Sequence, residues 1–261
     1  PLWPERWAYD ALMQRKAEIG SLKFTREYLC VPISTGTALF NPEFIEKCKN
    51  KEYVLKLGNR KEKGYKYYVG VDPAISTDGD YNVITVLEVD ESKNKAIVHV
   101  DRAKNIEFRE NIQKIRLIGK VFEPEEILFE TNTFAKAFTQ ELKNMTDLNV
   151  RDFNTTRKKK QEIILNLQMN IENQKIIMPY GDNASRRLTN ALIEELSMFS
   201  ITASGKFEGV GAHDDLVMSL ALANAASQGT GGQFVLLDDL DIFDEPTTTR
   251  RSVSGVMGIN F

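Results

Sequence analysis

The sequence predicts an α/β fold in which a mixed sheet carries helices on both faces. The first three predicted strands are separated only by short turns rich in Asp, Gly, Ser and Asn, which favours an antiparallel meander. The last two alternate with helical patterns, and a strand reached through a helix pairs in parallel with a neighbour. Together these observations predict a five-stranded sheet. The runs rich in β-branched and aromatic residues that predict its strands are residues 66–72, 83–89, 96–102, 125–130 and 149–153.

Helical spacing of apolar residues predicts the elements that cover this sheet. The last helix is nearly all apolar after its first two residues, so we expect it to be buried. Before it, residues 201–210 contain Ser204-Gly205, a pair typical of a hairpin turn. The helices are predicted at residues 5–20, 108–122, 134–142, 158–173, 184–199 and 214–226, with shorter ones near residues 24–31 and 42–45.

The chain divides by composition into three parts. Residues 1–60 are expected to form a helical linking segment, residues 61–228 the main domain, and residues 229–261, rich in Gly, Thr, Ser and Asp, a flexible tail. The sequence begins without methionine, so we interpret it as a piece of a longer protein.

Composition excludes several classes of protein. Hydrophobic residues make up 42% and charged residues 27%, which is typical of a soluble globular chain. A net charge of −3 disfavours a purely charge-driven nucleic-acid binder, although it allows a local basic groove. No apolar run is long enough to span a membrane, and no signal peptide is evident. Cys30 and Cys48 lack metal-ligand spacing, which favours a reducing compartment without disulfides.

Acidic residues stand at the ends of three predicted elements. Asp72 ends the first strand before Pro73, Glu130 ends the fourth, and Asp214 and Asp215 begin the buried helix. If the first and fourth strands are parallel neighbours, their carboxylates emerge at one edge of the sheet. Carboxylates gathered there would raise one another's pKa unless cations neutralised them, and oxygen ligands suit Mg²⁺ or Mn²⁺. Two such ions, about 3.5–4 Å apart, can support hydrolysis of a phosphodiester.

Each acidic residue taken alone also has a simpler explanation. Asp72 suits the start of a turn, and Glu130 suits a solvated position before a helix. Asp214 suits a helix N-cap, with Asp215 complementing the helix dipole. His213 suits a packed position beside the cap. The shared location at one predicted edge favours the metal site, and no rival catalytic arrangement is visible, because His99 and His213 are the only histidines.

A basic run at the start of a predicted helix is the strongest candidate for contact with nucleic acid. Arg157, Lys158, Lys159 and Lys160 follow the fifth strand at the same predicted edge of the sheet. Such a run is also typical of a solvated helix face, so both interpretations stay open. Positive charge at a helix N-terminus is unfavourable to the helix dipole, which favours a binding role. Lys206, in the predicted hairpin, is a weaker candidate of the same kind.

Three segments resemble the nuclease domain of the large terminase subunit of tailed bacteriophages, which has a ribonuclease H-like fold. These are Val69-Gly70-Val71-Asp72-Pro73-Ala74, the strand-ending Glu130, and the segment from Gly211 to Ser219 that contains His213-Asp214-Asp215. The resemblance covers about residues 7–226. It implies a DNA-cutting enzyme with two Mg²⁺ or Mn²⁺ ions held by Asp72, Glu130 and Asp215, with Asp214 as an added or alternate ligand. We expect an endonuclease of little sequence specificity, because no motif that reads the DNA grooves is visible.

The resemblance also implies a setting. Such a domain would cut concatemeric double-stranded viral DNA during genome packaging, in the host-cell cytoplasm at the portal of the procapsid, with no membrane involved. Expected partners are DNA, the portal, the small terminase subunit and the ATPase domain of the same subunit. No Gly-x-x-x-x-Gly-Lys-Ser/Thr loop occurs, so we do not expect this chain to hydrolyse ATP.

Alternative functions stay open from the sequence. A junction resolvase or a transposase-type nuclease would use the same fold, and a non-catalytic module that docks on DNA or the portal would not need the acidic residues. A sugar-kinase-like phosphotransferase also opens with three strands and an aspartate. It needs a glycine-rich phosphate loop, however, and here no glycine follows Asp72 until Gly79.

Overall fold

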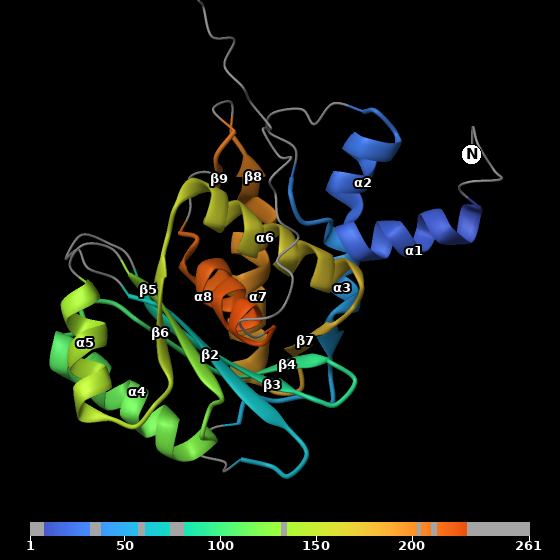
Figure 1. Ribbon diagram of the computed structural model, residues 1–261. Helices are drawn as coiled ribbons and strands as arrows, with labels where there is room; N and C mark the ends of the chain where they lie inside the picture. Colours follow the sequence, from blue (N-terminus) through green and yellow to red (C-terminus); the bar gives the residue numbers. More distant parts are fainter. Residues whose placement is uncertain are drawn as a thin grey trace, which may run out of the picture.

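The computed structural model confirms the α/β architecture (Figure 1). The predicted tail at 229–261 and the turn residues 203 and 204 lie outside the described residues, as do residues 5–7 of the first predicted helix. The structure describes residues 8–31, 38–56, 61–73, 81–131, 135–202, 205–209 and 213–228.

Within these residues the main sheet has seven strands in the order β1-β7-β4-β3-β2-β5-β6. The predicted meander is confirmed as β2, β3 and β4, which pair antiparallel, and β5 and β6 add in parallel beside β2. The strands are β1 (Lys49–Asn50), β2 (Lys66–Asp72), β3 (Asn82–Val89), β4 (Lys95–Ala103), β5 (Glu126–Thr131), β6 (Val150–Asn154) and β7 (Ile176–Pro179).

The predicted strand number, five, was too low. The additional strands are β1 and β7, which join the sheet in parallel beside β4. They are two and four residues long, so neither carries enough alternation to be recognised. A second, two-stranded sheet formed by β8 (Phe199–Ile201) and β9 (Phe207–Gly209) confirms the predicted hairpin.

Helices cover the sheet on both faces (Figure 1). The helices α6, α7 and α8 lie on one face, and α4 and α5 lie on the other. Among the described residues, no helix is long and apolar enough to cross a membrane. The helices are α1 (Tyr9–Ile19), α2 (Ser21–Tyr28), α3 (Pro42–Lys47), α4 (Phe108–Phe122), α5 (Ala135–Met145), α6 (Arg157–Glu172), α7 (Asn183–Met198) and α8 (Asp215–Ala226).

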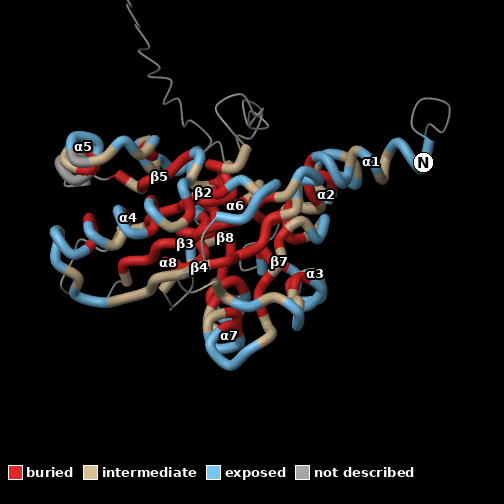
Figure 2. The backbone as a smooth tube through the Cα atoms, turned by 90° about the horizontal axis from the view of Figure 1, so that it is seen from below, coloured by how far each residue is buried: buried red, intermediate tan, exposed pale blue. Residues whose placement is uncertain are grey.

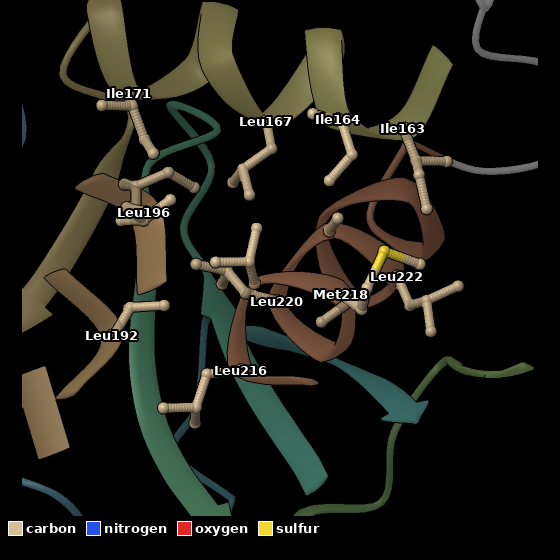
Figure 3. Packing of buried hydrophobic residues seen from close by; sticks show 14 of the residues in the cluster. Ile163, Ile164, Leu167, Ile171, Leu192, Leu196, Leu216, Met218, Leu220 and Leu222 are labelled. Carbon is tan, nitrogen blue, oxygen red and sulfur yellow. The ribbon is translucent and has the colours of Figure 1, made fainter. Parts of the chain in front are cut away.

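The helix α8 is the central element of its layer. All twelve of its residues are buried, as its apolar sequence predicts. Figure 3 shows Ile164 and Leu167 of α6 pointing toward Met218 and Leu220 of α8. Burial of apolar side chains on every side fixes the position of α8 against both the sheet and α6.

Residues before the predicted boundary at 60 also contribute to this body. Phe40 and Ile45 are in the same buried cluster as α8, and β1 pairs with β7. The short helix α3 is capped as predicted, because the Asn41 side chain accepts a hydrogen bond from the Glu43 N–H. The helix α1, by contrast, is mostly exposed and extends outward (Figure 2). The division of the chain at residue 60 stays a prediction.

A buried polar network links α6 and α8 to the sheet at the start of β4. Lys95 Nζ donates to Asn170 Oδ1 of α6 at 3.0 Å and to Asn224 Oδ1 of α8 at 2.6 Å. Asn224 in turn donates to Asn166 Oδ1 at 2.9 Å. Burial, together with nearby Lys93 and Lys175, lowers the pKa of Lys95 to about 8.

This lysine gives the protein a specific dependence on pH. The folded-state pKa of about 8 lies below the ordinary value of 10.5, so between these values the unfolded chain holds a proton that the folded chain lacks. Stability should therefore rise with pH across that window and lose this contribution as pH falls toward 8. Relative to Lys95→Met, the wild-type free energy of unfolding should gain about 3 kcal/mol between pH 8 and 10.5.

Urea unfolding of both proteins across this pH range measures the difference. The variant Lys66→Met, which changes an exposed lysine at the start of β2, is the control. It should give a curve parallel to that of the wild type. Parallel curves for Lys95→Met as well would contradict the lowered pKa.

Candidate acidic active site

The sheet topology places Asp72 and Glu130 side by side. The strands β2 and β5 are parallel neighbours, with Val71 opposite Phe129, so the next residue on each strand is Asp72 and Glu130. Side chains alternate along a strand, and Val71 and Phe129 belong to the cluster under α4 and α5. Asp72 and Glu130 therefore face the opposite layer, where α8 lies.

The start of α8 places two further carboxylates at this edge. The helix packs closely on β2, because the Ser219 hydroxyl donates to the Gly70 carbonyl at 3.0 Å, two residues before Asp72. From this anchor α8 extends back to Asp215 and Asp214 at its N-terminus. The Asp215 side chain is buried, and its Oδ2 accepts a hydrogen bond from the Tyr81 N–H at 3.1 Å.

The pKa of Asp72 responds to the three other carboxylates of this group. Burial raises the pKa of Asp72 well above its ordinary value, and the Glu130, Asp215 and Asp214 carboxylates raise that pKa further. A hydrogen bond between the Asp72 and Glu130 carboxyl groups acts in the same direction. The four predicted acidic residues thus lie close enough to interact, at the edge of the sheet where the sequence placed them.

The donor set fits a hard divalent cation in chemistry. All four groups offer carboxylate oxygens, the ligands that Mg²⁺ and Mn²⁺ prefer. As the side chains are placed, no three His, Cys, Asp or Glu residues in the described part of the chain form a ready ligand cluster. Asp214 Oδ2 is paired with Lys160 Nζ at 2.8 Å. Binding of a cation by all four carboxylates would therefore use Asp214 Oδ1 or displace Lys160 from Oδ2.

The prediction that the Asp214 side chain caps α8 is wrong, whereas the predicted packed position of His213 is confirmed. Asp214 occupies the N-cap position of α8, yet its side chain makes no capping hydrogen bond. His213 packs edge-on against the Tyr81 ring, with centroids 5.2 Å apart, and its Nδ1 lies 3.6 Å from Asp215 Oδ2. His213 is therefore a packed neighbour of the acidic group.

The predicted basic residues lie at the start of α6 and in the hairpin. Arg157, Lys158 and Lys159 are exposed, whereas Lys160 is partly buried and bound to Asp214. Next to Lys160, the Gln161 side chain donates to the Gly205 carbonyl at 3.0 Å, which anchors the hairpin to α6. Exposed Lys206 follows Gly205, so the basic run and Lys206 lie near each other. Their role in binding nucleic acid stays a prediction.

Three residues around Asp215 were not predicted. Glu195 of α7 accepts hydrogen bonds from the first turn of α8, and Arg102 of β4 forms an ion pair with Glu195 at 2.9 Å. The Arg102 guanidinium also lies over the Tyr81 ring, 3.9 Å from its centroid. One signal was available in the sequence, because Glu195 is a charged residue among the inward-facing leucines Leu192 and Leu196.

A mixed sheet of this topology, with an acidic group between its strand ends and a buried helix, defines a ribonuclease H-like domain. The sequence matches a family model described as "Terminase RNaseH-like domain" over residues 69–226. That match covers more than half of the chain. The chain therefore belongs to the terminase RNase H-like domain family.

Two curated relatives are large terminase subunits. That of Thermus virus P23-45 is 26% identical over 245 residues, and that of Thermus phage G20c is 25% identical over 245 residues. Each alignment covers 88% of this chain but only 46% of the relative, so the chain spans about half the length of these proteins.

Solved structures support the same fold. The large terminase nuclease from the thermophilic phage G20c superposes with a TM-score of 0.57 at 21% identity, covering 72% of this chain and 97% of that one. The large terminase nuclease domain of Thermus phage P74-26 gives a TM-score of 0.55 at 20% identity and covers 75% of this chain and 98% of that one. At these identities the likeness establishes the fold.

Proposed function

We propose that this domain is a divalent-metal-dependent endonuclease that cuts double-stranded viral DNA during genome packaging. The observation that carries the proposal is the meeting of four carboxylates at one edge of the sheet, because β2 and β5 pair in parallel up to Asp72 and Glu130 and the N-terminus of α8 adds Asp214 and Asp215. An acidic group of this kind destabilises the protein unless cations offset its charge, and such groups are characteristic of functional sites. A structure of the similar G20c nuclease contains magnesium, which supports the proposal for this chain.

Each acidic residue has a proposed role. Asp72 of β2, Glu130 of β5 and Asp215 of α8 would hold two Mg²⁺ or Mn²⁺ ions. The bound ions would supply an activated water and stabilise the charge that develops on the phosphate. Asp214 would serve as an added or alternate ligand. Tyr81 holds Asp215 in place through its backbone N–H.

The basic residues would hold the DNA strand beside this site. Arg157, Lys158 and Lys159 are exposed at the start of α6, and Lys160 of the same helix is paired with a site carboxylate. Contacts of lysine and arginine with phosphates position DNA without reading its sequence. Low sequence specificity follows from this type of contact. The portal, the small subunit and an ATPase domain of the same subunit are proposed partners, in the host cell.

Digestion of supercoiled plasmid tests the activity. Incubation with Mg²⁺ or Mn²⁺ should give nicked and linear products, and excess chelator should abolish them. Plasmid that stays intact with both metals, at protein concentrations that bind DNA, would contradict the proposed activity.

Neutralising the basic run should weaken DNA binding at every sequence tested. The triple variant Arg157→Gln, Lys158→Gln, Lys159→Gln should bind duplex DNA less tightly, and its plot of log affinity against log salt should be shallower by up to about 3, roughly one per lost phosphate contact. Fluorescence anisotropy at several salt concentrations measures both quantities.

The matched control removes three exposed charges far from the site. The variant Lys66→Gln, Arg116→Gln, Lys120→Gln has the same change in net charge, at the start of β2 and on α4. It should keep the wild-type salt dependence. Equal loss of affinity in both triple variants would show that only net charge matters and would contradict the basic run as the binding surface.

A further inference from the structure

The first turn of α8 is capped by a residue from a different helix. The N–H groups of Leu216 and Val217 donate to Glu195 Oε2 at 2.8 and 3.3 Å. An aspartate at the N-cap normally accepts these bonds with its own side chain. Asp214 occupies that position without doing so, and its Oδ2 is bound to Lys160 instead. Glu195 of α7, and not Asp214, therefore accepts the capping hydrogen bonds of α8.

Glu195 is itself held firmly in place. Its side chain is only 6% exposed, and its second oxygen, Oε1, accepts a hydrogen bond from Arg102 Nη2 at 2.9 Å. Arg102 in turn lies over the ring of Tyr81, whose N–H donates to Asp215 Oδ2. These contacts connect the first turn of α8 to Glu195 of α7, Glu195 to Arg102 of β4, and Arg102 to Tyr81, which binds Asp215 of α8.

We propose that Glu195 is a positioning residue of the acidic site, and that it caps α8 so that the Asp214 carboxylate remains available to the site. This inference rests on the proposed function of the acidic group. Without Glu195, the N–H groups of Leu216 and Val217 would lack this acceptor, and the N-cap side chain is the usual replacement. Asp214 holds the N-cap position, so we expect its carboxylate to turn toward its own helix and away from the other carboxylates.

Calorimetric titration of the full chain with Mn²⁺ tests this role. Glu195→Ala should weaken Mn²⁺ binding by about tenfold or more, as is typical when an outer partner of a ligand set is lost. Glu195→Gln should stay within about threefold of the wild type, because the amide oxygen can still accept the two N–H bonds. Glu194→Ala, which removes the adjacent exposed carboxylate, should leave Mn²⁺ binding unchanged.

The melting temperature without metal gives an independent measurement. Asp214→Ala alone should lower Tm no more than Lys160→Met does, because both changes break the Lys160–Asp214 ion pair and Asp214 does not cap the helix in the wild type. In the Glu195→Ala background the same change should lower Tm by about 2–4 °C, since Asp214 would then have become the cap. This second result distinguishes a change of capping from a general loss of packing.

The outcomes separate the inference from the proposed function. A wild-type chain that binds no Mn²⁺ would overturn the proposed function. A wild-type chain that binds Mn²⁺, with Glu195→Ala binding equally well, would overturn the positioning role and leave the function standing. If Glu195→Ala does not fold, Asp214→Ala decides alone, because a Tm drop about 2–4 °C larger than that of Lys160→Met, which breaks the same ion pair, would indicate a lost cap and overturn the inference.

Discussion

Asp72→Asn is expected to fold like the wild type and to lose plasmid cleavage by about 10³-fold or more, since it removes one of the carboxylates that would hold the proposed metal ions. The fold should tolerate the change. Asp72 lies in a cluster of like charges, and burial and repulsion already raise its pKa. A neutral isostere relieves that repulsion, so the Tm should stay equal or rise.

A loss of cleavage without a loss of Tm distinguishes the loss of a catalytic residue from simple unfolding. Cleavage is measured on supercoiled plasmid with Mn²⁺, and Tm is measured on the same preparation without metal. Asp147→Asn, which changes an aspartate before β6, away from the acidic group, is the control and should change neither. Cleavage at the wild-type rate by a folded Asp72→Asn protein would remove Asp72 from the mechanism.

Gly70→Ala is expected to have the largest effect on stability. A Cβ atom at this position would lie 2.1 Å from the Ser219 carbonyl oxygen and 2.4 Å from the Ala223 nitrogen, both in the backbone of α8. Backbone atoms of a buried helix cannot move aside without loss of packing, so we expect a cost of about 3 kcal/mol in the free energy of unfolding. Displacement of α8 should also weaken Mn²⁺ binding, because α8 carries Asp215.

Gly119→Ala is the matched control for this prediction. The three atoms nearest to the added Cβ in α4, at 2.6–3.2 Å, all belong to the side chain of Leu148, which can change rotamer to make room. Alanine also favours the helix over glycine, by up to about 1 kcal/mol. Urea unfolding should therefore give a near-neutral Gly119→Ala and a strongly destabilised Gly70→Ala. Equal midpoints for the two variants would show that α8 does not pack against β2 as described.

The sequence predicted strands β2 to β6 of the main sheet but not β1 and β7, which form one edge of it. The strand at residues 66–72 was placed at its observed bounds because its β-branched and aromatic residues end at Asp72-Pro73. The parallel pairing of β2 with β5 followed from the helix that precedes β5, and this pairing brought Asp72 to Glu130. The strands β1 and β7 could not be predicted, because each is too short to show a pattern of its own. They are strands only through pairing with segments distant in sequence, β1 with β7 and β7 with β4.

In the site, too, local sequence patterns predicted some residues, whereas others are determined only by how the helices pack. The positions of Asp72, Glu130 and Asp215 follow from strand ends and a helix start, which local patterns reveal. The role of Glu195 depends on how α7 meets the first turn of α8, and no local pattern encodes that contact. Lys160 shows the limit most clearly, because a run of four basic residues did not indicate that one of them pairs with Asp214.

Anomalous diffraction from crystals soaked in Mn²⁺ tests the central claim most directly, because manganese is located without reference to activity. We expect two anomalous peaks about 3.5–4 Å apart within the group formed by Asp72, Glu130 and Asp215. A map with no peak at Asp72, from crystals of protein that cleaves plasmid in Mn²⁺, would contradict the assignment of this acidic group as the active site.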